Sequence, residues 1–185
     1  MLKSRPDRHG AIAVSIHWLS AVLILALLGS GFRAANAMDA VTKAGLLRFH
    51  IPVAIVVLLL TALRIVWWWR FDRKPAPVQA SPRWQERLAG FVHVAFYIFI
   101  LGMVASGIGM MILSGAAPAV FGAAGATLPD FTAYPPRGPH GFGAFLLVGL
   151  LVFHASAALY HQFVRGDHLL RRMWYGGCDP AAVDV

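Results

Sequence analysis

Four long stretches of mostly apolar residues constrain the fold of this 185-residue chain more than any other feature. Each can cross a hydrocarbon core of about 30 Å, because an α-helix needs about 20 residues to do so. Only 13% of the residues are charged, against about a quarter in a typical soluble domain. We therefore expect an all-α integral membrane four-helix bundle, a single domain over residues 1–185 with spans at about 11–32, 46–69, 88–113 and 139–164.

The basic residues are distributed unevenly between the two ends of these expected helices. Twelve of the sixteen fall at one end, and cytoplasmic loops of membrane proteins carry such an excess of Lys and Arg. This pattern places both termini in the cytoplasm and explains the net charge of +8 without a nucleic-acid partner. The other end has the remaining four basic residues, Arg33, Lys43, Arg48 and Arg137.

The first apolar stretch is too long for the apolar region of a signal peptide, and it contains His17, so we expect it to be retained as a span. Cys178 is the only cysteine, which excludes an intramolecular disulfide and a Cys-x-x-Cys-His haem attachment site. Prolines between residues 74 and 82 interrupt any helix between the second and third stretches. A connection at about 114–138 is long enough to cover the non-cytoplasmic end. No internal repeat in residue identity is evident.

His140 and His154 lie fourteen residues apart in one apolar stretch, with no charged residue between them. In an α-helix, fourteen residues turn about 1400°, close to four full turns, so both imidazoles share one face. They are separated by roughly 21 Å along the axis, a large part of the bilayer core. One helix thus offers a nitrogen ligand near each membrane surface, which suits two haems stacked across a bilayer.

Three further histidines fall at matching depths in the other stretches. His50 lies near the non-cytoplasmic end, as His140 does, whereas His17 and His93 lie near the cytoplasmic end with His154. A single membrane histidine can serve packing alone, and such a scaffold without redox activity is one alternative. Zinc or di-iron sites favour nearby carboxylates, which these stretches lack, so paired imidazoles point to bis-histidine haem b. Depth alone leaves the cytoplasmic pair open among His17, His93 and His154.

Arginines accompany the histidines at both depths. Arg64 follows His50 by fourteen residues, and Arg48 and Arg137 lie beside His50 and His140. A guanidinium can hold a haem propionate with two hydrogen bonds. For Arg64, an equal alternative is a side chain that extends to the membrane surface beside Trp67–Trp69.

Several short motifs together resemble the bacterial cytochrome b-561 family, small four-span di-haem proteins of the inner membrane. They are Ser15–Leu19, His50 with Arg64, His140 with His154, and the segment Gly166–Arg171. The resemblance covers about residues 15–173. It implies that His17 pairs with His154 and His50 with His140 as the ligands of two haem b groups, and that His93 is not a ligand.

The same resemblance implies an oxidoreductase activity in which superoxide is oxidised and ubiquinone in the membrane is reduced. Lys43, Arg48 and Arg137 would attract the superoxide anion to the non-cytoplasmic end. Near the cytoplasmic end, a quinone would bind near Trp18, His93, His161 or Arg64. The alternative is a cytochrome b subunit that relays electrons between quinone and a separate dehydrogenase or hydrogenase, with a protein redox partner docked at that outer surface.

Overall fold

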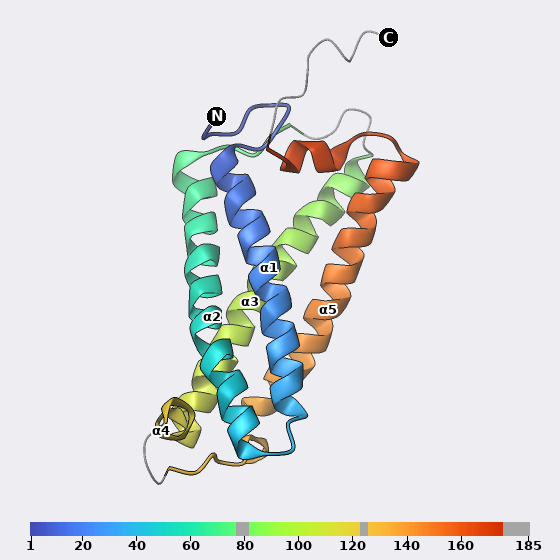
Figure 1. Ribbon diagram of the computed structural model, residues 1–185. Helices are drawn as coiled ribbons and strands as arrows, with labels where there is room; N and C mark the ends of the chain where they lie inside the picture. Colours follow the sequence, from blue (N-terminus) through green and yellow to red (C-terminus); the bar gives the residue numbers. More distant parts are fainter. Residues whose placement is uncertain (77–81, 123–125, 176–185) are drawn as a thin grey trace.

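The computed structural model describes residues 1–76, 82–122 and 126–175, and the regular structure in these residues is entirely helical (Figure 1). Two π-helical turns, Trp67–Phe71 and Tyr160–Val164, continue the second and last long helices. Short 3₁₀ turns lie at Phe131–Ala133 and Leu169–Met173. The α-helices are α1 (Ala11–Ala35), α2 (Ala40–Val66), α3 (Arg83–Ser114), α4 (Ala117–Phe121) and α5 (Arg137–Leu159).

Local sequence signals set the ends of these helices. The Asp39 carboxylate caps α2 by accepting a hydrogen bond of 2.7 Å from the Thr42 backbone N–H. Pro82 precedes α3 directly, and α3 ends at Gly115, whose φ of +60° favours glycine. Pro136 immediately precedes α5, where its missing N–H costs nothing.

Among the described residues, four helices meet the length and hydropathy needed to cross a membrane: Ala11–Ala35, Ala40–Phe71, Arg83–Ser114 and Arg137–Val164. They contain the four spans expected from the sequence and extend most of them by several residues. The added residues include charged ones such as Arg33, Lys43 and Arg83, which a hydropathy criterion does not assign to a span. Helix α4 lies in the long third connection, of which residues 123–125 are outside the described residues.

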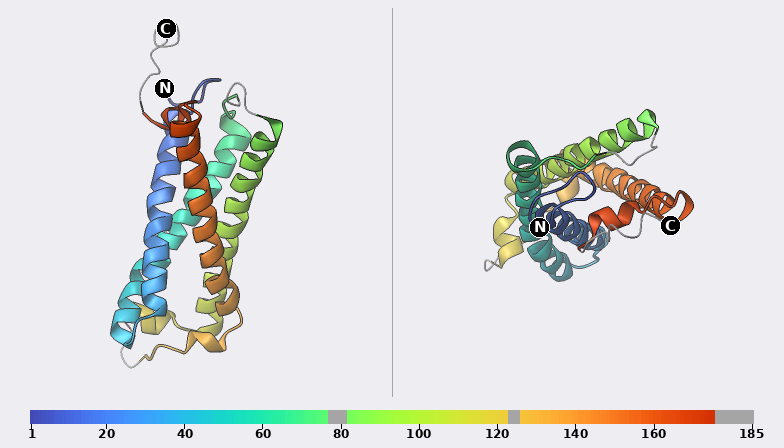
Figure 2. Two further views of the ribbon diagram at one scale, coloured as in Figure 1. Left: turned by 90° about the vertical axis from the view of Figure 1, so that its right-hand side faces the viewer. Right: turned by 90° about the horizontal axis from the view of Figure 1, so that it is seen from above.

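The long helices are arranged as two pairs, α1 with α2 and α3 with α5, and the main close approach between the pairs is between α2 and α3. Figure 2 shows both pairs from the side and along the bundle axis. Helix α1 begins and α5 finishes at the same end of the bundle, which we call the terminal end. We call the opposite end, which carries α4, the α4 end.

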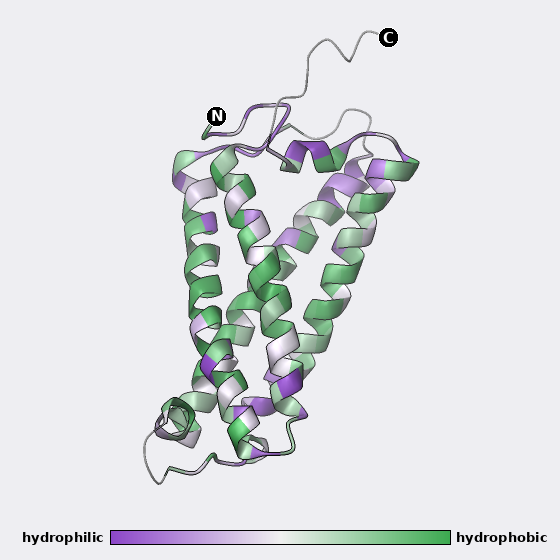
Figure 3. Ribbon diagram, viewed as in Figure 1, coloured by the Kyte–Doolittle hydropathy of each residue, from purple (hydrophilic) through white to green (hydrophobic). Residues whose placement is uncertain are grey.

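A small core joins the pairs at mid-height, where each long helix contributes one buried residue: Ile24, Val57, Ile100 and Leu147. Much of the remaining apolar surface points outward, and Phe145 is 67% exposed. Figure 3 shows that apolar residues cover the middle of all four helices, while polar residues gather at the two ends. Exposed apolar side chains over a whole helical belt are stable in lipid rather than in water. The fold is that of a multi-pass membrane protein.

Candidate functional site

Histidines from different helices face one another at both ends of the bundle. At the α4 end, the ring centroids of His50 (α2) and His140 (α5) are 6.3 Å apart with an interplanar angle of 63°. At the terminal end, the rings of His17 (α1) and His154 (α5) are also 6.3 Å apart, at 62°. The two pairs therefore have nearly the same geometry, and both use the imidazoles of α5.

The separation of these rings can be compared with what metal ligation requires. A metal–imidazole bond is about 2 Å long and the bonding nitrogen lies about 1 Å from the ring centre, so two rings on opposite sides of one ion have centroids about 6 Å apart. Both pairs match this value. Within residues 1–76, 82–122 and 126–175, no group of three or more His, Cys, Asp or Glu side chains is arranged to hold a single ion. The arrangement suits a metal that takes two protein ligands.

The α4-end histidines each contact a serine and a glycine of the neighbouring helix, and the two serines are not singled out by the sequence analysis. His50 Nδ1 lies 3.0 Å from Ser30 Oγ, and His140 Nδ1 lies 2.9 Å from Ser106 Oγ. A Cβ atom added at Gly31 would lie 3.1 Å from His50 Cε1, and one added at Gly107 would lie 3.4 Å from His140 Cε1.

A third histidine, His93 of α3, also lies at the terminal end. Its ring centroid is 5.7 Å from that of His154, and its Nδ1–H donates to the Ala89 carbonyl oxygen at 2.7 Å. His17 instead accepts a hydrogen bond at Nδ1 from Arg64 Nη1 at 3.2 Å. The structure thus brings together the three candidates that depth left open, with the guanidinium of Arg64 among them.

The other two predicted terminal-end residues have partners in the C-terminal segment. Trp18 Nε1–H donates to the Met173 carbonyl oxygen at 2.8 Å, and its ring contacts that of His17 at 5.4 Å. His161 Nδ1 lies 2.5 Å from the Asp167 carboxylate, and both side chains are largely shielded. His161 therefore forms a histidine–carboxylate pair beside the other terminal-end residues rather than contacting their rings.

The N-terminal segment, residues 1–10, covers the terminal end and is held there by backbone hydrogen bonds and by two side chains. The Asp72 carboxylate accepts hydrogen bonds from the backbone N–H and the hydroxyl of Ser4, the latter at 2.8 Å, and from Trp67 Nε1. Arg172 donates to the backbone carbonyl oxygens of Pro6, Asp7 and Ala76. Burial opposes ionisation of Asp72, but the hydrogen bonds from Ser4, Arg73 and Trp67 together hold the pKa of this carboxyl below its usual range.

Two buried nitrogens in this region have no hydrogen-bond partner among the described residues: His9 Nδ1, in the segment itself, and Arg64 Nε, in α2. Burial, followed by the nearby charges of Arg172 and Arg64, lowers the pKa of His9 to about 4. A buried donor without an acceptor is costly. This region is thus suited to an anionic group that would accept from Arg64.

We expect Asp72→Ala to release the N-terminal segment. The substitution removes several hydrogen bonds to a charged acceptor, each worth about 1.5–3 kcal/mol, so opening should increase at least about tenfold. Limited proteolysis of the detergent-solubilised protein, with cleavage mapped to residues 1–10, measures this directly. Asp7→Ala is the matched control. Asp7 accepts from Arg172 through its backbone carbonyl, and the substitution leaves that carbonyl in place. Equal cleavage rates in the two variants would show that Asp72 does not hold the segment.

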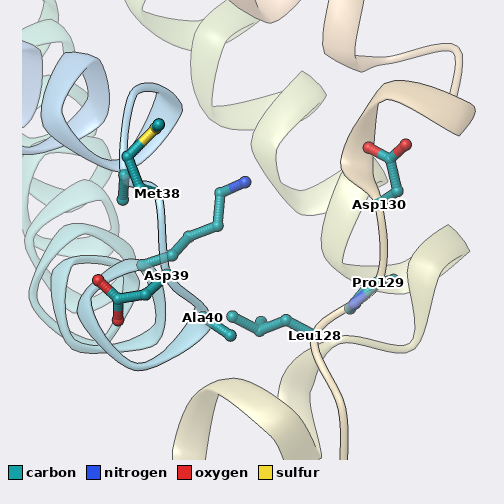
Figure 4. Close-up of a pocket in the computed structure, with 8 residues that line it drawn as sticks. Met38, Asp39, Ala40, Leu128, Pro129 and Asp130 are labelled. Atoms are coloured by element: carbon teal, nitrogen blue, oxygen red, sulfur yellow. The ribbon is translucent and has the colours of Figure 1, made fainter.

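At the α4 end, the three predicted basic residues have different surroundings. Arg48 Nε donates to the Val120 carbonyl oxygen and so ties α2 to α4. The Arg137 guanidinium lies over Gly141, next to His140. Lys43 lines a pocket with Asp39 and Asp130 (Figure 4), and its charge interacts with the Asp130 carboxylate, whose pKa it helps the hydrogen bonds from Thr132 to lower. Of these three basic residues, Arg137 is the one whose guanidinium lies over the residue that follows an α4-end histidine.

Comparison with known proteins agrees with this architecture. The family model described as prokaryotic cytochrome b561 matches residues 8–176. The chain belongs to the prokaryotic cytochrome b561 family. It is 29% identical over 175 residues to cytochrome b561 homolog 2 of Escherichia coli (strain K12), which covers 91% of this chain and 92% of the relative. It is 28% identical over 135 residues to cytochrome b561 homolog 1 of the same organism, covering 67% of this chain and 72% of that relative.

The family resemblance predicted from the short motifs is therefore confirmed. Membership in the prokaryotic cytochrome b561 family indicates a bacterial membrane protein that binds haem b and carries out transmembrane electron transfer. The four apolar helices and the histidines at two depths are features that such a function requires.

Proposed function

We propose that this chain, as a single membrane domain over residues 1–185, carries two b-type haems and passes electrons from superoxide to ubiquinone. The observation that supports this most directly is the pair of matching ring separations, 6.3 Å for His50 with His140 and 6.3 Å for His17 with His154. We assign the terminal end to the cytoplasm, because twelve of the sixteen basic residues fall there.

Haem binding at the terminal end would change the partner of Arg64. A histidine that binds iron through Nε2 has its proton on Nδ1, and His17 Nδ1 could then no longer accept from Arg64 as it does here. The Arg64 guanidinium would then be free to bind a haem propionate. Its Nε, which has no hydrogen-bond partner among the described residues, could donate to the same group. His93 is the competing ligand, since its ring is also close to that of His154, and we assign His17 on the family pattern.

A haem with two histidine ligands has no open coordination position, so when bound it transfers electrons and does not activate oxygen. The overall reaction is balanced when two superoxide anions each lose one electron to become O₂, while one quinone takes up two electrons and two protons. At the α4 end, Arg137 would attract the superoxide anion, with a smaller contribution from Arg48, whose Nε is bonded to Val120.

The protons for quinone reduction would come from water at the terminal end and reach the quinone through side chains there. His161 and Asp167 form a hydrogen-bonded pair there that can accept a proton from water and pass it on. We assign the quinone headgroup to the vicinity of Trp18 and His93, with Arg64 nearby. The indole N–H of Trp18 is already bonded to Met173, so this side chain would contribute an apolar ring face.

The experiment is to mix the purified, haem-loaded protein with superoxide and a soluble ubiquinone analogue, with no other protein present. The proposal predicts fast loss of superoxide together with one quinol formed for every two superoxide anions. Slow superoxide loss, together with haems that are reduced only when a co-purified dehydrogenase or hydrogenase is added, would replace superoxide with a protein redox partner as the donor.

A further inference from the structure

The two helix pairs, α1 with α2 and α3 with α5, differ in sequence overall, but a few residues of the first pair recur at corresponding positions of the second. His17, Ser30 and Gly31 of α1 correspond to His93, Ser106 and Gly107 of α3, after a uniform shift of 76 residues. In the partner helices, His50 and His140 correspond after a shift of 90 residues, which also relates Arg64 to His154. The expectation of no internal repeat was therefore wrong for these positions, which are too few and too widely spaced to stand out along the sequence.

The core follows the same correspondence. The shifts of 76 and 90 residues relate Ile24 to Ile100 and Val57 to Leu147, the four buried residues that join the helix pairs. The correspondence is complete at the α4 end, where each pair supplies one histidine, one serine and one glycine. The correspondence is incomplete at the terminal end, because the position in α2 that corresponds to His154 is occupied by Arg64 instead of a histidine.

Each α4-end serine hydroxyl makes two contacts that together determine the protonation of its histidine. Ser30 Oγ–H donates to the Leu27 carbonyl oxygen at 3.1 Å, and Ser106 Oγ–H donates to the Met103 carbonyl oxygen at 3.0 Å. A hydroxyl has a single hydrogen, so it must accept in its second hydrogen bond. The donors of those bonds are then His50 Nδ1–H and His140 Nδ1–H, at 3.0 Å and 2.9 Å.

We propose that Ser30 and Ser106 are positioning residues that hold both α4-end histidines with the proton on Nδ1 and the Nε2 lone pair available to one haem iron. This inference rests on the proposed two-haem function. It adds to that function an account of how the two α4-end histidines are oriented and which of their nitrogens carries the proton. A hydrogen bond from Nδ1–H orients a ligating imidazole and makes it a stronger donor to the metal. Because the arrangement is duplicated, the iron would receive equal support from both sides.

The glycines beside the serines leave room for the imidazole rings. A Cβ at Gly31 would lie 3.1 Å from His50 Cε1, and a Cβ at Gly107 would lie 3.4 Å from His140 Cε1. A methyl group at Gly31 would require the His50 ring to shift by a few tenths of an ångström, whereas one at Gly107 would reach the His140 ring at about van der Waals contact. The closer approach at Gly31 makes that position the less tolerant of the two.

The test is to purify Ser30→Ala, Ser106→Ala and the double variant with haem and to titrate both haems potentiometrically by visible absorption. Each alanine variant should raise the midpoint potential of the α4-end haem, because a weaker imidazole donor stabilises ferric iron less. The two single shifts should be similar and should add in the double variant, while the terminal-end potential stays unchanged. Haem transfer to apomyoglobin from the α4 end should be about tenfold faster or more.

Two further variants separate positioning from general packing. Ser30→Thr retains the hydroxyl, so the midpoint potential of its α4-end haem should equal that of the wild-type protein rather than that of Ser30→Ala. Ser114→Ala is the control within α3, because the buried hydroxyl of Ser114 has no hydrogen-bond partner among the described residues. Gly31→Ala should speed haem loss more than Gly107→Ala, and Gly29→Ala should leave it unchanged, because a Cβ at Gly29 meets no atom within 4 Å.

The inference is overturned if the alanine variants keep the wild-type α4-end potential and haem loss rate, or if they shift both haems equally. That outcome is distinct from failure of the proposed function, which would be seen in the wild-type protein as the absence of one or both haems.

Discussion

Replacement of His50 or His140 by alanine should lower the haem content of the purified protein from two haems per chain to about one. In the proposed two-haem protein, each of these histidines would supply one of the two protein ligands of the α4-end haem, since their ring centroids lie 6.3 Å apart. Loss of one imidazole leaves the iron with a single protein ligand, which does not hold a b-type haem in the low-spin state. The pyridine haemochrome assay gives the content, and the visible spectrum at low temperature shows which haem remains.

The same assay decides between the two possible partners of His154. His17→Ala and His154→Ala should each remove the terminal-end haem, whereas His93→Ala should leave both haems in place. The assignment is not trivial, because the ring of His93 lies 5.7 Å from that of His154. If His93→Ala removes the terminal-end haem and His17→Ala does not, then His93 is the ligand and the family pattern does not hold for this chain.

Charge reversal at Arg137 should lower the second-order rate constant with superoxide by about tenfold at low ionic strength. Arg137 lies one helical turn before His140, and its guanidinium is placed over Gly141. Its effect should weaken as salt is added, because the Debye length falls from about 10 Å at 0.1 M to about 3 Å at 1 M. Pulse radiolysis at low and high salt, with haem content matched between proteins, measures both effects.

Two controls show whether the effect concerns the superoxide anion. Reduction of the haems by a neutral quinol should be nearly unchanged in Arg137→Glu. Lys43→Glu should have a smaller effect than Arg137→Glu, because Lys43 lies in a pocket with the carboxylates of Asp39 and Asp130. A wild-type superoxide rate that is slow and insensitive to salt would contradict superoxide as the donor. A changed haem spectrum in Arg137→Glu, with no selective loss of the salt-dependent rate, would assign Arg137 to haem retention alone.

The membrane fold could be predicted from sequence because it depends on hydropathy summed over long stretches, to which every residue in a stretch contributes. Long apolar runs determine the four spans, and Pro82 and Pro136 mark the starts of α3 and α5. The spacing of His140 and His154 on one helix likewise determines that the histidines occupy two depths, since helical rise is constant. Which imidazoles face each other depends on how four helices are arranged, and periodicity along one helix does not contain that information.

The residues that sequence reasoning missed act through a neighbouring helix. Ser30 and Ser106 are ordinary small residues in an apolar run, and their relation to His50 and His140 exists only after α1 pairs with α2 and α3 pairs with α5. A search at fixed spacing could have found them, because the separation of His17 from Ser30 equals that of His93 from Ser106. His9 lies outside every span, and its Nδ1 is buried only because the N-terminal segment folds back over the terminal end.

The central claim is that the chain holds two haems at different depths, and a redox titration of the wild-type protein tests it most directly. The purified protein is titrated potentiometrically while its visible spectrum is recorded, and its haem is counted against protein concentration by pyridine haemochrome. The account predicts two b-type haems per chain and a titration curve with two one-electron components. One haem or none per chain under full loading would contradict it.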